Sequence, residues 1–190
     1  MNYELRIMNR ELKNMNWKVL SSEYLFKRPW LTARRDVCQL PDGRIMNEYY
    51  VLEYPTFINV IAITKDGHMV LVRQYRHGLG RTCFELVAGC VEEGEDPMDA
   101  AKRELLEETG YSGGEWSETM VFSCNASAMN NLSHSFLAIG VELTGKQNLD
   151  ATEDIEVYSF TQDEVREMLL RGDFMQASMI APLYKYFAQI

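Results

Sequence analysis

Short apolar or alternating runs, bounded by turn residues, predict β-strands over much of the chain. Residues 17–54 read as several short strands around a turn at Pro41-Asp42-Gly43. Further strands are predicted at residues 58–63, 69–75, 83–88, 118–122, 135–143 and 155–160. Lys65-Asp66-Gly67 is a strong hairpin signal between the first two of these later strands.

A helix is predicted from about residue 97 to residue 109. Asp96 is a favourable N-cap, and Pro97 fits the first helical position because an N–H has no helical partner there. Gly110 is suited to end the helix, since glycine readily adopts the left-handed conformation that follows many last turns.

Two helical segments are predicted near the C-terminus. One begins at Thr161 or Asp163 and ends near Gly172. The other, residues 174–190, is apolar on much of its surface and contains Pro182. Because an interior proline breaks or kinks a helix, we expect a kinked helix or two pieces packed on the sheet. Mixed strands with two or three helices predict an α/β sandwich.

Composition narrows the classes of partner. A length of 190 residues favours one main domain, after an irregular or helical lead-in over residues 1–15. The net charge of −9 disfavours binding to nucleic acid, because phosphate backbones are recognised by basic patches. The apolar runs are far shorter than a membrane span. We therefore expect no nucleic-acid partner and no membrane insertion.

The cysteines and the N-terminus indicate a compartment. The four cysteines, at positions 38, 83, 90 and 124, lack the spacing of a metal site. The first residues mix charges and lack the apolar core of a signal peptide. We expect reduced, mostly buried thiols in a cytoplasmic protein.

Three glutamates share one side of the helix predicted at 97–109. Glu104 precedes Glu107 by three positions and Glu108 by four, which brings the side chains close together. Like charges at this spacing destabilise a helix unless a cation compensates them. Clustered carboxylates suit Mg²⁺, with Mn²⁺ as the alternative. Arg103, four positions before Glu107, is placed to hold that carboxylate by charge-assisted hydrogen bonds.

The alternative is a solvated acidic helix face, which is what most charge runs are. We favour the metal site because further residues accompany the glutamates at fixed spacing. These residues are Gly89, Glu95, Arg103, Glu104, Leu105, Glu107, Glu108, Gly110 and Tyr111. Together they match the complete Nudix box, so the chain resembles the Nudix hydrolases. The resemblance implies an α/β/α sandwich that cleaves nucleoside diphosphates linked to another group. It also implies that Glu104, Glu107 and Glu108 bind the activating metals.

The resemblance extends upstream of the box. Gln74-Tyr75-Arg76 and Glu85-Leu86-Val87-Ala88-Gly89 are similar to the corresponding segments of ADP-ribose and nucleotide-sugar pyrophosphatases. This similarity implies that the Ala88 carbonyl is a further metal ligand and that Arg76 contacts the diphosphate. It also implies that Glu85 and Gly89 take part in binding the substrate.

In this interpretation residues 55–190 form the Nudix domain, which contains the box. Residues 1–54 form a separate N-terminal region that this domain does not require for its fold. In similar proteins the corresponding N-terminal region forms a small sheet that helps build a homodimer. The resemblance therefore implies a β-rich dimerisation region here. Aromatic residues of this region stack on the nucleobase in such proteins, and Tyr49 and Tyr50 are our first candidates. Packing in the core or the dimer is an equally good alternative for each.

One stretch departs from the subfamily pattern. After the box, such enzymes have a loop with an acidic residue that assists the attacking water, whereas residues 123–134 contain no Asp or Glu. Asn130 or Asn131 falls where the acid is expected, and asparagine cannot be a general base. Either a box glutamate takes the role of base, or the substrate preference differs, or activity is low.

These features predict a metal-dependent hydrolase whose catalytic residues are Arg103, Glu104, Glu107 and Glu108. Its small-molecule substrate is expected to be ADP-ribose or a nucleotide sugar, cleaved at the diphosphate. One alternative is a non-catalytic module that binds a nucleotide sugar. Another is a nucleoside triphosphate pyrophosphohydrolase, against which the segments upstream of the box argue. The base, the sugar and the physiological role stay open.

Overall fold

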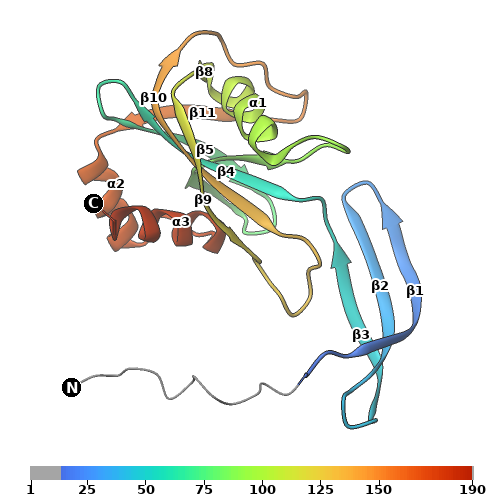
Figure 1. Ribbon diagram of the computed structural model, residues 1–190. Coiled ribbons are helices and arrows are strands. Elements are labelled where there is room, and N and C mark those ends of the chain that lie inside the picture. Colours follow the sequence, from blue (N-terminus) through green and yellow to red (C-terminus); the bar gives the residue numbers. More distant parts are fainter. Residues whose placement is uncertain (1–13, 190) are drawn as a thin grey trace, which may run out of the picture. The chain divides into compact units, whose positions relative to one another are not determined.

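The computed structural model describes residues 14–189 (Figure 1). Contacts between residues divide the chain into two compact units, with the division between Tyr54 and Pro55. The expectation of an irregular or helical start falls almost entirely on residues outside the described range.

The first unit is an antiparallel sheet of three strands in the order β1-β2-β3. Its strands are β1 (Lys18–Arg28), β2 (Leu31–Gln39) and β3 (Ile45–Glu53). The predicted turn between the last two is confirmed, and Gly43 adopts a φ of 88° there. Short strands were predicted in this region, but the strands are 9 to 11 residues long and their pairing continues past register shifts.

The second unit is built on a mixed sheet of eight strands. They are β4 (Phe57–Thr64), β5 (Met69–Arg76), β6 (Arg81–Glu85), β7 (Val87–Cys90), β8 (Tyr111–Ser112), β9 (Glu115–Phe122), β10 (Ser133–Leu143) and β11 (Ile155–Phe160). The central order is β11-β5-β4-β10-β8, while β6, β7 and β9 pair with β5, β4 and β10. Only the β4–β10 pair is parallel among these pairings of described strands.

Helices cover both faces of this sheet (Figure 1). The helix α1 (Pro97–Thr109) packs on one face, and α2 (Gln162–Arg171) and α3 (Ala177–Phe187) pack on the other. Along β4, Val60 faces the α1 core and Ile61 faces the α2–α3 core, and both are fully buried. The predicted α/β/α sandwich is therefore confirmed. Within residues 14–189, no helix has the length and apolar character needed to cross a membrane.

The single strand predicted at residues 83–88 is wrong. The chain forms β6 and β7 there, separated at Leu86, and β6 pairs with β5 whereas β7 pairs with β4. Leu86 itself is fully buried in the core beside α2 and α3. The run looks continuous in sequence because residues 83–88 are all buried or half-buried. A change of hydrogen-bonding partner does not alter the hydrophobic pattern.

The last segment forms one helix, so of the two predicted alternatives, a kinked helix or two pieces, the two pieces are excluded. Pro182 lies inside α3 and is buried. A proline has no N–H to donate to the carbonyl four residues earlier, which here is that of Ser178. The Asn59 side-chain amide donates to this carbonyl instead, at 3.2 Å, so the carbonyl keeps a partner and the helix continues.

Gly110 ends α1 at a crowded position. Its φ is 77°, and its carbonyl accepts hydrogen bonds from the backbone N–H groups of Thr144 and Gly145, each at 3.0 Å. A Cβ at residue 110 would lie 2.7 Å from the Gly145 carbonyl oxygen. The loop after β10 therefore holds the end of α1 at a distance that only glycine permits.

We predict that Gly110→Ala destabilises the protein more than Gly172→Ala does. Both glycines end helices with positive φ, but a Cβ at Gly172 has nothing within 4 Å. Gly172→Ala should cost about 1–2 kcal/mol of unfolding free energy from backbone strain. Gly110→Ala should add roughly 1–3 kcal/mol from steric overlap. Urea denaturation measures both values, and equal losses would contradict the crowding argument.

Candidate active site

The glutamate-bearing helix α1 is pressed against strand β7 near Gly89. Its start is capped by Asp96, whose carboxylate accepts from the Met98 N–H at 2.8 Å. A Cβ on Gly89 would overlap the carboxyl group of Glu104. Gly89 was predicted from the resemblance as a substrate-binding residue, and the structure gives it a definite steric role. It leaves the space that the Glu104 carboxylate occupies.

Arg103 joins the loop before α1 to two glutamates of the helix. Its guanidinium makes a bidentate pair with Glu95, with both distances 2.9 Å. It also donates to Glu104 at 2.9 Å and to Glu107 at 3.2 Å, which confirms the predicted contact with Glu107. Its bond to the Cys90 carbonyl, 3.1 Å long, attaches this network to β7. Hydrogen bonding to Glu95 raises the pKa of Arg103, and the same contact lowers the pKa of Glu95.

Glu108 lies deeper than its neighbours. The residue is only 3% exposed, and its carboxylate accepts from the Ala88 N–H at 3.3 Å. Burial, and then the negative charge of Glu104, raises the pKa of Glu108 to about 8. Burial is also the main reason that the pKa of Glu104 is raised. These shifts mark negative charge that the surrounding protein compensates incompletely.

The charge of a fourth carboxylate, Glu153, acts on the same cluster. Its negative charge contributes to raising the pKa values of both Glu104 and Glu108. It comes from the loop between β10 and β11, where its side chain accepts from the Asp150 N–H and its own N–H donates to the Asp150 carbonyl. Glu153 was not among the predicted site residues, because the acid was expected at residues 123–134. The acidic pair directly before the strand predicted at 155–160 was the available signal.

Within residues 123–134, the stretch that lacks an acid, Asn131 makes a structural hydrogen bond. Asn131 is 9% exposed and donates its side-chain amide to the Pro55 carbonyl at 2.7 Å. This bond ties the end of the stretch to the chain just before β4. Asn130 is exposed. Asn131 therefore has a structural role at this position, and its contacts do not require a catalytic role.

Arg76 and Glu85, both predicted to bind substrate, lie together. The Arg76 guanidinium donates from Nε to Glu85 at 2.9 Å and from Nη2 at 2.5 Å. Glu85 is 1% exposed, and its contact with the guanidinium raises the pKa of Arg76. The Glu85 carboxylate therefore fixes the plane of a guanidinium whose side chain is 38% exposed.

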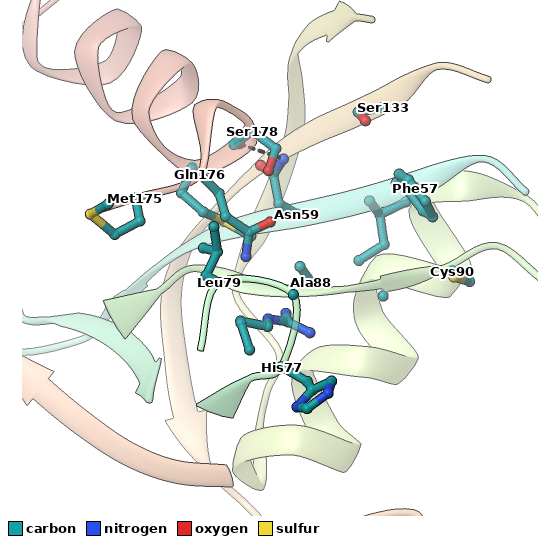
Figure 2. A pocket seen from close by; sticks show the side chains of 15 residues that line it. Phe57, Asn59, His77, Leu79, Ala88, Cys90, Ser133, Met175, Gln176 and Ser178 are labelled. Atoms are coloured by element: carbon teal, nitrogen blue, oxygen red, sulfur yellow. Dashed lines mark hydrogen bonds between the residues drawn. The ribbon is translucent and has the colours of Figure 1, made fainter. Parts of the chain in front are cut away.

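A cavity of about 570 Å³ opens beside these residues (Figure 2). Its walls come from five places: the start of β4, the end of β5 with the turn after it, strand β7, the start of β10 and the start of α3. Residues from these places include Phe57, Asn59, Arg76, His77, Ala88, Gly89, Gln176 and Ser178. Ala88 and Gly89 thus separate the cavity from the glutamates of α1, which places a volume suited to a ligand next to the acidic cluster.

The donor chemistry fits a hard divalent cation, since the carboxylates and the Ala88 carbonyl are oxygen ligands. In residues 14–189, however, no three acidic, histidine or cysteine side chains converge as a ready ligand group. Arg103 binds Oε1 of Glu104 and Oε2 of Glu107. Each carboxylate has a second oxygen that Arg103 does not bind, so both can accept a cation while Arg103 orients them.

Tyr49 and Tyr50 lie on β3 of the first unit. The Tyr49 ring packs edge-on against Trp17, with 5.7 Å between ring centroids and 75° between ring planes. Tyr50 is 52% exposed. Tyr49 thus contacts one aromatic neighbour within the first unit. Stacking on a nucleobase, and packing in the core or the dimer, stay predictions for both tyrosines.

Two family descriptions match the sequence. "NUDIX domain" matches residues 54–181, and "Nucleoside diphosphate sugar hydrolase N-terminal domain" matches residues 17–52. An ADP-ribose pyrophosphatase of Bacillus subtilis (strain 168) is 30% identical over 159 residues, which cover 83% of this chain and 85% of that protein. A methanol dehydrogenase activator of Bacillus methanolicus is 32% identical over 155 residues, covering 80% and 82%.

A solved structure has the same fold. It is described as the crystal structure of an ADP compounds hydrolase, and it superposes with a TM-score of 0.81 at 19% identity. The match covers 94% of this chain and 96% of that one. At this identity the similarity establishes the arrangement of strands and helices.

We predict that Glu108→Gln stabilises the protein at alkaline pH when a chelator is present. The pKa of folded Glu108 is raised from 4.5 to about 8, so its contribution to stability is full below pH 4.5 and is lost as the pH rises through about 8. Glutamine carries no charge and avoids this loss. Thermal unfolding at acidic and alkaline pH measures the difference.

The same experiment with saturating Mg²⁺ completes the test. Wild-type protein should gain thermal stability at alkaline pH, because the cation compensates the carboxylates, whereas Glu108→Gln should gain much less. A variant less stable than wild type at alkaline pH in chelator would contradict the burial argument.

Proposed function

The chain belongs to the Nudix hydrolase family, and from that premise we propose that it hydrolyses the diphosphate linkage of ADP-ribose or a related nucleotide sugar. The observation that carries this proposal is the junction at Ala88 and Gly89. There the carboxylates of Glu104 and Glu108 adjoin a cavity that Arg76 lines. The match of the N-terminal region to a nucleoside diphosphate sugar hydrolase family supports this substrate class.

Glu104, Glu108 and the Ala88 carbonyl would hold Mg²⁺, with Mn²⁺ as the alternative, and Glu107 would share a metal or orient water. When bound, the cation lowers the pKa of a coordinated water and neutralises charge on the phosphates. The protein contributes a fixed arrangement of oxygen donors. Arg103 contributes by orienting Glu104 and Glu107, and it is itself fixed by Glu95 and the Cys90 carbonyl.

Arg76 would contact the diphosphate from the cavity side. A guanidinium recognises phosphate oxygens through hydrogen bonds whose directions are set by its plane. The bidentate contact with Glu85 uses Nε and Nη2 and therefore sets that plane. Glu85 is buried, so we assign its part in substrate binding to the orientation of Arg76.

Glu153 would accept the proton of the attacking water. The role requires a carboxylate near the metal-binding glutamates, and the charge of Glu153 acts on both Glu104 and Glu108. Water attacks one phosphorus, and the bond from that phosphorus to the bridging oxygen breaks. The products are a nucleoside monophosphate and a phosphorylated sugar. With Glu153 in this role, the lack of an acid at residues 123–134 ceases to argue for a binding module without turnover.

A hydrolysis screen tests the assignment. With Mg²⁺ or Mn²⁺, ADP-ribose or a sugar nucleotide should be cleaved faster than dinucleotides or triphosphates. Glu153→Gln should lower kcat by about 10²–10⁴-fold, as expected for loss of a general base, with a small change in KM. Asp154→Asn is the matched control, since Asp154 is the adjacent exposed acid. A triphosphate as the best substrate would overturn the proposed substrate class. Full kcat in Glu153→Gln would overturn the proposed role of Glu153 as the general base.

The first unit would mediate a homodimer. All eleven residues of β1 are exposed, and large apolar side chains are among them. Tyr24, Leu25 and Phe26 are 51%, 41% and 57% exposed. Exposed large apolar side chains on an unpaired strand edge are often covered by a partner. The sequence resembles proteins in which this region helps build a homodimer, so the partner we propose is a second copy of the chain.

Phe26→Lys should shift the protein from dimer to monomer, because a buried lysine at an interface lacks a partner for its charge. Ser22→Lys on the same exposed strand is the matched control for added charge. Analytical ultracentrifugation over a range of concentrations measures the change. A wild-type protein that is monomeric at all concentrations would contradict the proposal.

We also propose a cytoplasmic location. All four cysteines are free thiols. Cys38 and Cys83 are buried, but Cys90 is half-buried and Cys124 is exposed, so the expectation of mostly buried thiols holds for two of the four. Reduced cysteines are typical of proteins kept in a reducing compartment.

A further inference from the structure

Gln176 occupies the N-cap position of α3 but does not cap the helix. Its backbone is extended, with φ −96° and ψ 129°, and its side chain makes no capping hydrogen bond. Ser, Thr, Asp and Asn are favoured at such positions because their side chains satisfy the first N–H groups of a helix. The side chain of Gln176 instead donates from Nε2 to the Glu85 carboxylate at 2.5 Å. Gln176 thus forms its hydrogen bond with Glu85 and none with the first N–H groups of α3.

The contact completes the surroundings of a buried charge. Glu85 is 1% exposed, and a carboxylate so deeply buried needs hydrogen-bond donors. Arg76 supplies two and Gln176 supplies a third, which shares the oxygen Oε1 with the Arg76 Nε. Because one oxygen takes both donors, the position of Gln176 constrains the carboxylate and, through it, the guanidinium of Arg76.

A second buried contact fixes the turn that carries Gln176. The Ser178 carbonyl receives no hydrogen bond from Pro182, which has no N–H, and accepts one from Asn59 Nδ2 instead. Asn59 Oδ1 accepts in turn from the Ser135 hydroxyl at 2.6 Å. Asn59 is 2% exposed and Ser135 is fully buried, so this anchor is shielded from water. Figure 2 shows the Asn59–Ser178 bond as a dashed line beside Gln176.

We propose that Gln176 is a positioning residue for the reaction: it holds Glu85 so that Arg76 meets the diphosphate in the cavity in one orientation. The proposal rests on the proposed function, because it takes Arg76 as the diphosphate contact. Gln176 acts through Arg76 and does not take part in proton transfer. Its removal therefore weakens binding of the diphosphate while the chemical step is largely retained.

Gln176→Leu tests this role, since leucine keeps apolar volume and removes the donor. With ADP-ribose and Mg²⁺, KM should rise about fivefold to tenfold, in the range of coupling between contacting residues. The value of kcat should change less than about twofold, since the groups proposed for chemistry are untouched. The Kd for inorganic pyrophosphate with Mg²⁺, measured by calorimetry, should rise by a similar factor. An unchanged KM and an unchanged Kd would overturn the proposal.

Gln162→Leu is the matched control. This glutamine is also partly buried, but it contacts the Gly67 carbonyl and the Tyr186 hydroxyl. The control should leave KM and the Kd for pyrophosphate unchanged even where it lowers thermal stability. Equal effects of the two leucine variants would overturn the specific role of Gln176. Gln176→Met, which keeps an unbranched side chain, replaces Gln176→Leu if that variant does not fold.

A double-mutant cycle with Arg76→Lys separates positioning from a direct contact. Lysine cannot make the bidentate pair, so in this background Gln176→Leu should have little further effect on the Kd for pyrophosphate. Additive effects would show that Gln176 acts independently of Arg76 and would overturn the proposal. A wild-type protein that binds pyrophosphate but leaves ADP-ribose intact would refute the proposed function alone, while the cycle would still decide the role of Gln176.

Discussion

The packing of a multiply charged helix face against a strand is the constraint on which the rest of the second unit depends. Glu104 fits because Gly89 has no side chain, and Glu108 is buried against the Ala88 N–H. Arg103 offsets part of the charge by binding Glu104 and Glu107, whereas Glu108 keeps a raised pKa. The fold thus maintains negative charge that its own cations balance incompletely, which suits a site for divalent metal.

Strand β7 contributes residues to both faces of the sheet, next to the acidic cluster on one face and beside α2 and α3 on the other. Side chains alternate along a strand, so Gly89 faces α1 while Ala88 packs toward α2 and α3. The acidic cluster lies on the first side, and the start of α3 lines the cavity with Ala88 and Gly89. One short strand therefore separates groups suited to metal from groups suited to the bound molecule. This division explains why polar residues of α3, far along the chain, contribute to a site centred on α1.

Buried polar contacts hold the cavity wall in place, and among the described residues none of their buried side-chain atoms lacks a hydrogen-bond partner. Pro182 removes a helical hydrogen bond, and Asn59 replaces the missing donor. Glu85 is buried with a charge, and Arg76 with Gln176 surrounds it. Satisfied networks of this kind specify a single arrangement, because any shift leaves a buried group without a partner. The wall is thus defined by hydrogen bonds as well as by apolar packing.

The sequence by itself determined the helix α1, from its Asp96 cap to Gly110, and the contact of Arg103 with Glu107. These features are local, since a helix repeats every few residues and its caps lie beside it. It also indicated the sandwich and most strands through the hydrophobic pattern. Only the tertiary structure decided the break at Leu86, the partner of the Ser178 carbonyl, the contact of Gln176 with Glu85 and the approach of Glu153 to α1. Each of these joins segments that are distant in the chain, and neither periodicity nor composition records which distant segment a side chain meets.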